Sequence, residues 1–313
     1  MACFKPLTAY LTNYSTNYET GKLYRRVTFD RKDPDIHSET QLPCGKCVGC
    51  RLERSRQWAV RCMHEAKMHE ENSFITLTYS DQYLPENNSL NHKDVQLFLK
   101  NLRRNLWYHH KKKIRYYMCG EYGENFGRPH YHIVLFGHQF EDKKYFFTSN
   151  SGSRVYTSQT LEDLWGKGHT SIGDVTFESA AYVARYVMKK ITGDQAKTHY
   201  GEDTDLQTGE IKLKKTPEYN KMSLKPGIGQ TWLDKFHPDV YPSDQVIIRN
   251  KPTKPPRFYD KKYSLFKPLE FEEIQHNREK EARKNYLDNT PERLAVKEKV
   301  TEAKLNKLKR KLV

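Results

Sequence analysis

Long apolar runs are missing from this sequence. Only 36% of its 313 residues are hydrophobic, and no stretch approaches the ~20 consecutive apolar residues that cross a bilayer. No signal-peptide pattern stands at its start either. We therefore expect a cytosolic protein with no membrane association. The length is sufficient for one or two hydrophobic cores of ordinary size.

Acidic residues are few relative to basic ones. The sequence has 39 aspartates and glutamates against 54 lysines and arginines, which gives a formal net charge of +15. This excess indicates nothing about the fold, but it favours a polyanionic partner. Aromatic residues make up 12%, with 21 tyrosines. That content suits stacking on unpaired bases, and it suits an ordinary core nearly as well.

Cysteines number six, and in a cytosolic protein they are reduced thiols or metal ligands rather than a disulfide framework. Cys44, Cys47 and Cys50 form a C-x-x-C-x-x-C run, and Cys62 follows twelve residues later. Four thiolates can hold a structural Zn²⁺ ion. His64 is a rival fourth ligand. An iron–sulfur cluster would lack the usual fourth cysteine and proline, and inert buried thiols are the remaining interpretation.

Two kinds of hydrophobic pattern alternate along the chain. Apolar residues at helical spacing predict helices over residues 48–70, 92–107 and 178–191. Runs of β-branched and aromatic residues predict strands at residues 74–79, 114–123 and 130–136. The turn NFGR joins the last two strands, so they should pair antiparallel. The predicted fold class is α+β, with a central antiparallel sheet flanked by helices rather than a doubly wound parallel sheet.

Three parts of the sequence differ in composition. Residues 1–70 contain the cysteine run and a helix, and residues 71–195 contain the alternating strands and helices. Residues 196–313 are predicted to form a C-terminal extension of loops and charged helices. Within these parts, residues 1–43 allow no firm prediction and residues 192–220 are polar and loop-like.

The stretch GRPHYHIVLFG places two histidines at the entrance of a predicted buried strand. In a strand, residues i and i+2 face the same side, so His130 and His132 project together. Glu121, near the end of the paired strand, is the predicted third ligand of a divalent metal ion, and Glu124 in the loop is the alternative. Two imidazoles and a carboxylate suit Mn²⁺ or Mg²⁺. An H-x-H pair alone also arises by chance in packed strands.

A second group of polar residues lies on the predicted helix over 178–191. In the stretch YVARYVMKK, Tyr182 and Tyr186 are four residues apart and therefore lie on one helix face. Lys189 and Lys190 follow about one turn later. Tyrosines also occur at the edge of the buried stripe of ordinary amphipathic helices. A tyrosine hydroxyl beside a metal-bound phosphate, in contrast, is a nucleophile for phosphodiester exchange.

The sequence resembles a known family. The segments FITLTY, RPHYH and YVARY match, in order, the three motifs of the HUH endonucleases. The segments PCGKCVGCR, FITLTYSD, CGEYG, RPHYHIVLFG, AAYVARYVMKK and SLKPGIG are similar to those of the replication initiators of gokushoviruses, within the Microviridae. The likeness runs from about residue 40 to beyond residue 290. The resemblance implies an HUH-like core, related to ferredoxin-like and RRM-like folds.

The resemblance also implies a function. Such initiators nick one DNA strand at the viral origin, remain joined to its 5′ phosphate through a tyrosine, and rejoin the strand to end rolling-circle replication. In the two-tyrosine subgroup, Tyr182 and Tyr186 would alternate as nucleophiles, and Lys189 would neutralise developing charge. The implied partners are single-stranded origin DNA together with a host polymerase and helicase, in the cytoplasm of a bacterial host.

Basic residues give candidates for contacts to DNA phosphates. They are Arg103, Arg104, Arg128, Arg185 and Lys190. Two other functions stay open at this point. One is a zinc-stabilised nucleic-acid-binding protein without catalysis, and the other is a transposase or plasmid relaxase of the same superfamily. The origin sequence, the nick site, the order of the tyrosines and the oligomeric state are not readable from the residues.

Overall fold

A computed structural model describes residues 3–16, 18, 21, 23–123, 126–186, 194–204, 209 and 211–307. These described residues fall into two compact units. One consists of the chain up to Arg54 together with the chain from Gln275 onward, and the other is Ser55–Ile274. The three-part division predicted from the sequence stays a prediction. None of the helices in the described ranges combines the length and the apolar content that crossing a bilayer requires.

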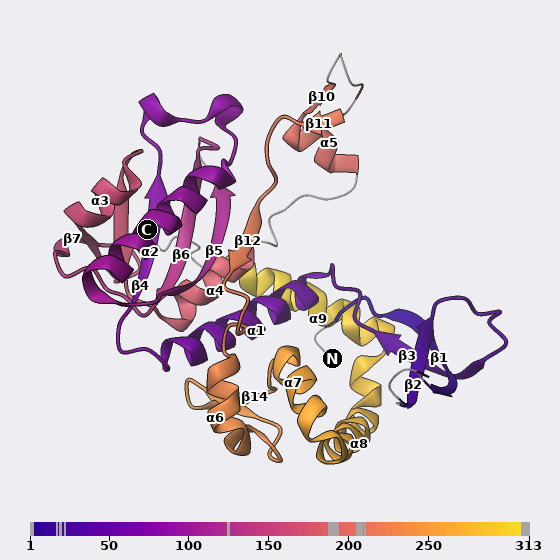
Figure 1. The fold of residues 1–313 in the computed structure, drawn as a ribbon. Coiled ribbons are helices and arrows are strands. Elements are labelled where there is room, and N and C mark those ends of the chain that lie inside the picture. Colours follow the sequence, from indigo (N-terminus) through magenta and orange to yellow (C-terminus); the bar gives the residue numbers. More distant parts are fainter. Residues whose placement is uncertain are drawn as a thin grey trace. The chain divides into compact units, whose positions relative to one another are not determined.

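The larger unit is built on a seven-stranded sheet (Figure 1) in which every neighbouring pair is antiparallel. From edge to edge, its strands are β12 (Tyr219–Met222), β5 (Arg115–Tyr122), β6 (Pro129–Phe136), β4 (Asn72–Thr78), β9 (Thr170–Gly173), β8 (Arg154–Thr157) and β7 (Lys144–Thr148). Together with its helices this sheet confirms the predicted α+β class. The expected hairpin of β5 and β6 is present, with Glu121 directly opposite His130.

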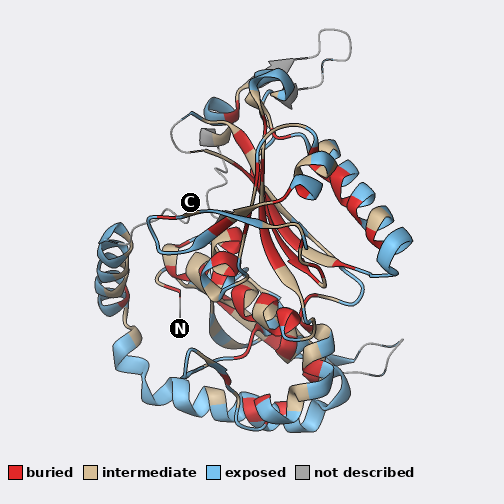
Figure 2. Cartoon of the chain, turned by 90° about the vertical axis from the view of Figure 1, so that its left-hand side faces the viewer, coloured by how far each residue is buried: buried red, intermediate tan, exposed pale blue. Residues whose placement is uncertain are grey.

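Helices cover both faces of this sheet. The helices α2 (His92–His110) and α3 (Gln159–Trp165) bury apolar side chains against one face, which includes Tyr131, Ile133 and Leu135. The helices α1 (Val48–Ala66) and α4 (Phe177–Tyr186) cover the other face. Figure 2 shows buried residues along the strands and along the inward side of these helices. Each large side chain fully buried in this way contributes about 1.5–3 kcal/mol.

The segment predicted to be loop-like, residues 192–220, is partly ordered. It contains α5 (Asp194–Tyr200) and the β10–β11 pair (Glu202–Thr204 with Ile211–Leu213), and β12 begins at Tyr219. The prediction was wrong here because these elements are short and polar. Beyond β12, the larger unit continues with α6 (Gln230–Val240), β13 (Val246–Ile248), β14 (Lys251–Thr253) and α7 (Arg257–Phe266).

The smaller unit contains a three-stranded antiparallel sheet in the order β2-β1-β3, with strands Leu23–Thr28, Leu7–Thr16 and Ile36–Leu42. The residue pattern of this region had allowed no firm prediction. Its helical part comes from the far end of the chain. That part is the end of α8 (Pro268–Lys284), the short helix η3 (Tyr286–Asn289) and α9 (Pro291–Lys307). The predicted helical tail is therefore confirmed.

Candidate metal and tyrosine site

Three potential metal ligands meet on the α4 side of the sheet. The carboxylate of Glu121 and the Nε2 atoms of His130 and His132 offer ligand atoms that all lie within 4.8 Å of one another. The distances from Glu121 Oε1 are 2.6 Å to His130 Nε2 and 3.0 Å to His132 Nε2. Pairing of β5 with β6 produces this group, because Glu121 is the cross-strand neighbour of His130. The alternative ligand Glu124 lies outside the described residues.

Neighbouring groups fix the orientation of both imidazoles. His130 Nδ1 lies 3.1 Å from the carbonyl oxygen of Arg128, which can only accept, so Nδ1 carries a proton. His132 Nδ1 lies 2.9 Å from Thr76 Oγ1, and the ring of Phe74 stacks on His132 at a centroid distance of 5.5 Å. Such outer contacts typically orient histidines that bind metals. Sequence reasoning missed both β4 residues, although their alternation with Ile75 places them on the ligand face.

The donor set fits a cation. With its Nδ1 protonated, a neutral His130 turns the lone pair of Nε2 toward a carboxylate oxygen 2.6 Å away. That contact is repulsive unless a proton or a metal ion lies in between. The second carboxylate oxygen, Glu121 Oε2, is buried and has no hydrogen-bond partner in the described part of the chain. A metal ion would satisfy these atoms together.

The charge of Glu121 is stabilised although the residue is only 2% exposed. Burial acts to raise the pKa of the Glu121 carboxyl. The hydrogen bonds from His130 and His132, with the charges of the two rings, outweigh burial and hold this pKa below its usual value. The carboxyl group is therefore ionised at neutral pH, as a metal ligand must be.

Tyr182 lies beside this group. Its hydroxyl donates to Glu121 Oε1 at 3.5 Å, and its ring meets the ring of His132 edge to face at 5.1 Å. Helix α4 is held in place on the sheet, because Asn220 of β12 donates to the carbonyl of Val183 at 3.1 Å and Ser55 donates to the carbonyl of Ala181 at 3.0 Å. The position of the phenol is therefore set by hydrogen bonds to backbone atoms of its own helix.

The start of α4 has a reciprocal cap. Thr176 N donates to Ser179 Oγ at 2.9 Å, and Ser179 N donates to Thr176 Oγ1 at 3.2 Å. At the other end, Tyr186 is the last residue of the helix, and its side chain is not described. Lys189 and Lys190 lie outside the described residues. The predicted roles of Tyr186 and both lysines stay predictions.

Two cavities lie next to the ligand group, one at each end of β4. One has a volume of about 560 Å³ and is lined by Thr78, Ser80, Phe126, Arg128 and His130, among others. The other has a volume of about 440 Å³, and its lining includes Phe74, Thr76 and Ser179. Both are large enough for part of an extended polar ligand.

The predicted phosphate-binding residues are divided between the two sides of the sheet. Arg128 lines the larger cavity, where its guanidinium binds Asp81 at 2.6 Å and the carbonyl of Tyr79 at 2.9 Å. Arg185 is half-buried on α4. Arg103 and Arg104 are exposed on α2, which covers the opposite face, so the structure does not bring them to the site.

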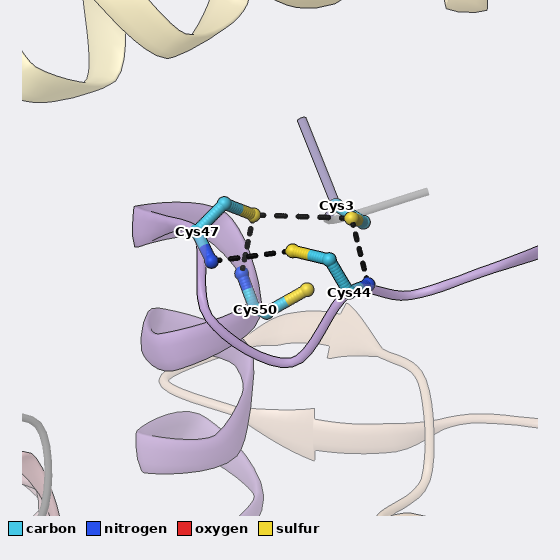
Figure 3. Close-up of side chains that lie close together, drawn as sticks. All are labelled: Cys3, Cys44, Cys47 and Cys50. Carbon is cyan, nitrogen blue, oxygen red and sulfur yellow. Dashed lines mark hydrogen bonds between the residues drawn. The ribbon is translucent and has the colours of Figure 1, made fainter. Parts of the chain in front are cut away.

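The predicted cysteine group has a different fourth member. Cys44, Cys47 and Cys50 lie together with Cys3 (Figure 3), and their sulfur atoms are all within 4.8 Å of one another. Cys62 was the wrong choice. It lies twelve residues beyond Cys50 on the same helix, a rise of about 18 Å, and it is fully buried among core residues.

The rival fourth ligand, His64, has another role. Its Nδ1 lies 2.9 Å from the hydroxyl of Tyr259, and its ring stacks on Trp232 at 3.5 Å. Burial lowers the pKa of His64 to about 3, so the ring is neutral and belongs to the hydrophobic packing of the larger unit.

Comparisons with known proteins agree with this site. A family of replication-associated proteins, described under the name ORF2, matches residues 72–191, which include all three potential ligands and Tyr182. The replication-associated protein VP4 of Bdellovibrio phage phiMH2K is 35% identical over 232 residues, covering 72% of this chain and 69% of the relative. The replication-associated protein ORF2 of Spiroplasma virus 4 is 32% identical over 302 residues, covering 91% and 88%.

A third relative, the replication-associated protein ORF4 of Chlamydia phage 1, is 39% identical over 153 residues, covering 48% of this chain and 38% of the relative. No solved structure matches the chain. An antiparallel α+β core with a histidine–carboxylate group beside a tyrosine defines the class of protein. Within that class, the chain belongs to the replication-associated proteins of phages, as a replication initiator of the Microviridae type.

Proposed function

We propose that this protein nicks and rejoins single-stranded DNA at the viral origin. A tyrosine oxygen attacks the scissile phosphate, a P–O bond to tyrosine forms, and the P–O bond to the 3′ oxygen breaks. The phenol loses a proton and the leaving 3′ oxygen gains one. The products are a 5′-phosphotyrosine link and a free 3′-hydroxyl, which a host polymerase extends while a helicase separates the strands.

The position of Tyr182 is the observation that carries this proposal. Its hydroxyl lies 3.5 Å from Glu121 Oε1, at the centre of the potential ligand group. A Mg²⁺ or Mn²⁺ ion held by Glu121, His130 and His132 would make the scissile phosphorus more electrophilic. The hydrogen bond from Tyr182 to Glu121 holds the phenol at the same place, which favours in-line attack by proximity.

The reverse reaction explains the second tyrosine. Exchange of one phosphodiester for another is nearly isoenergetic, so the strand can be rejoined without a nucleotide cofactor. One tyrosine would hold the 5′ end while the other attacks the regenerated origin. Tyr186 is one helical turn from Tyr182, close enough to share the same ligand group. Lys189 would neutralise charge that develops on the phosphate.

Single-stranded DNA would approach the site through the two flanking cavities. The net charge of +15 favours a polyanion. Phe126, which is 82% exposed at the larger cavity, offers a ring on which a base can stack. Arg128 and Arg185 would contact phosphates near the site. Membership in a family of phage replication-associated proteins favours this function over a transposase or relaxase.

The test is formation of a covalent adduct. Single-stranded origin DNA incubated with the protein and Mn²⁺ or Mg²⁺ should give a protein band whose shift survives denaturing electrophoresis. The double variant Tyr182→Phe/Tyr186→Phe should give no such band, and each single variant identifies which tyrosine cuts first. Tyr145→Phe, a 59% exposed tyrosine on β7, is the matched control and should form the adduct normally.

Two results would contradict the proposal. One is an adduct that persists in the double variant, which would assign the chemistry to another residue. The other is binding of origin DNA without an adduct under either metal ion, which would favour the non-catalytic nucleic-acid-binding protein.

A further inference from the structure

The smaller unit contains a second group of potential metal ligands. We propose that Cys3, Cys44, Cys47 and Cys50 bind one structural Zn²⁺ ion that fastens the amino-terminal segment to the start of α1. The four sulfur atoms approach from three directions, because Cys3 precedes β1, Cys44 follows β3, and Cys47 and Cys50 belong to the first turn of α1 and the residue before it (Figure 3).

The spacing of the sulfur atoms suits a single tetrahedral ion. Cys3 Sγ and Cys47 Sγ are 3.8 Å apart, and all four sulfurs lie within 4.8 Å of one another. A tetrahedral site with Zn–S bonds of ~2.3 Å separates its sulfurs by about 3.8 Å. All four are free cysteines, so no disulfide competes for them. An iron–sulfur cluster would need more room, because several iron and sulfide ions would lie between the four sulfurs.

Backbone amides point at the sulfur atoms. Cys47 N donates to Cys44 Sγ at 3.3 Å, and Cys50 N donates to Cys47 Sγ at 3.5 Å. Cys44 N donates to Cys3 Sγ at 3.3 Å, and Phe4 N donates to Cys47 Sγ at 3.3 Å. N–H donors favour the ionised form of a thiol, which is the form that binds a metal. The amino terminus of α1 adds a positive partial charge at the same point.

The packing of this unit indicates why an ion is needed. The buried cluster around these residues consists of Cys3, Cys47 and Cys50, with Phe4 and Cys44 packed against it. Large apolar residues of the β2-β1-β3 region are exposed instead, as Leu7, Tyr14, Tyr24, Val27 and Phe29. Small units with so little apolar core usually depend on a disulfide or a metal ion. With four protein ligands the site would be closed, as structural zinc sites are.

The experiment measures metal in the full-length protein without DNA, so its outcome is independent of the nicking reaction. Purified wild-type protein should contain about one Zn²⁺ per chain by elemental analysis, and a mercurial reagent should release that zinc. Cys3→Ser should lose at least about nine-tenths of the zinc, because three thiolates bind far more weakly than four. Cys62→Ala is the matched control on the same helix and should keep it.

A spectroscopic measurement guards against a variant that loses zinc only because it is misfolded. Wild-type protein reconstituted with Co²⁺ should give the intense visible absorption of a tetrahedral tetrathiolate site. Cys3→Ser should bind Co²⁺ weakly and with an altered band, because one sulfur has been replaced by oxygen. Zinc-free wild-type protein, wild-type protein that carries iron in place of zinc, or zinc loss in Cys62→Ala with retention in Cys3→Ser would each overturn the proposal.

Discussion

The two faces of the seven-stranded sheet differ in what their side chains do, and β6 contributes to both. Tyr131, Ile133 and Leu135 are completely buried beneath α2 and α3. His130 and His132 project from the same strand toward α4 and meet Glu121. Because the side chains of a strand alternate, one buried strand can anchor the sheet and carry polar ligands. The packing face needs only shape and apolar area, whereas the polar face needs a partner for every buried group.

The largest expected effect is the loss of chemistry when the polar face loses its charge. Glu121→Gln keeps the shape of the side chain and removes the negative charge. We expect adduct formation to slow by about 10³-fold or more, equivalent to about 4 kcal/mol of activation free energy, with little change in the melting temperature. The rate of adduct formation at saturating Mn²⁺ is the measurement. Glu141→Gln, an exposed glutamate, is the control. An unchanged rate would show that the carboxylate is not needed.

A truncation on the packing face should have the opposite signature. Leu102 of α2 is 1% exposed, so Leu102→Ala should lower the free energy of unfolding by about 3 kcal/mol. Nicking per folded molecule should be unchanged, because α2 packs on the face of the sheet opposite to the ligand group. Urea unfolding and the adduct assay give the two quantities. Leu97→Ala, 45% exposed on the same helix, should cost less than about 0.5 kcal/mol.

The covering helices also differ in pH dependence. The buried residues of α2 are all apolar, whereas α1 buries His64, whose pKa is lowered by burial to about 3. In the unfolded chain His64 takes up a proton below its ordinary pKa near 6.5, but in the folded chain it does not. Stability should therefore fall as the pH drops from 6.5 toward 3, by about 1.4 kcal/mol per pH unit from this residue.

Comparison with His64→Phe isolates this contribution. The variant keeps an aromatic ring against Trp232 and removes the titration. Urea unfolding at pH 7 and pH 5 should show a loss of stability that is about 2 kcal/mol smaller for the variant than for the wild type. Equal losses in both proteins would mean that His64 is protonated in the folded state.

The smallest expected effect concerns the arginines. Arg185→Ala, on α4, should reduce the salt dependence of single-stranded DNA binding by about one phosphate contact. Arg103→Ala/Arg104→Ala, on α2 across the sheet, should leave that dependence unchanged. Binding titrations at several salt concentrations measure both. The reverse result would place the DNA on the packing face and would separate DNA binding from the ligand group.

The polar face could be predicted from the sequence where local rules apply. The apolar run after His132 indicates a buried strand, and the short turn between the two strands sets the register that brings Glu121 opposite His130. Tyr182 follows from helical spacing on the next long amphipathic segment. These inferences need only neighbours in the chain, and the structure brings Glu121, His130, His132 and Tyr182 together.

What could not be predicted depends on long-range contacts. Cys3 joins the cysteine run from 41 residues before Cys44, and no spacing rule covers such a distance, whereas Cys62 lay at a familiar spacing and was wrong. The strand β12 has only four residues with no apolar alternation, so it could not be recognised. Thr76 was missed because a threonine in a strand is ordinary until a histidine lies beside it.

The contacts of Asn220 bear on how the protein could be shortened for use as a DNA-tagging tool. Asn220 binds the hydroxyl of Tyr117 and the carbonyl of Val183, and Ser55 binds the carbonyl of Ala181. A fragment trimmed to the family match at residues 72–191 would lack both, along with the α1 residues that cover the tyrosine face. A minimal fusion partner should therefore begin no later than Ser55 and extend at least through Ile228, which packs in the same cluster.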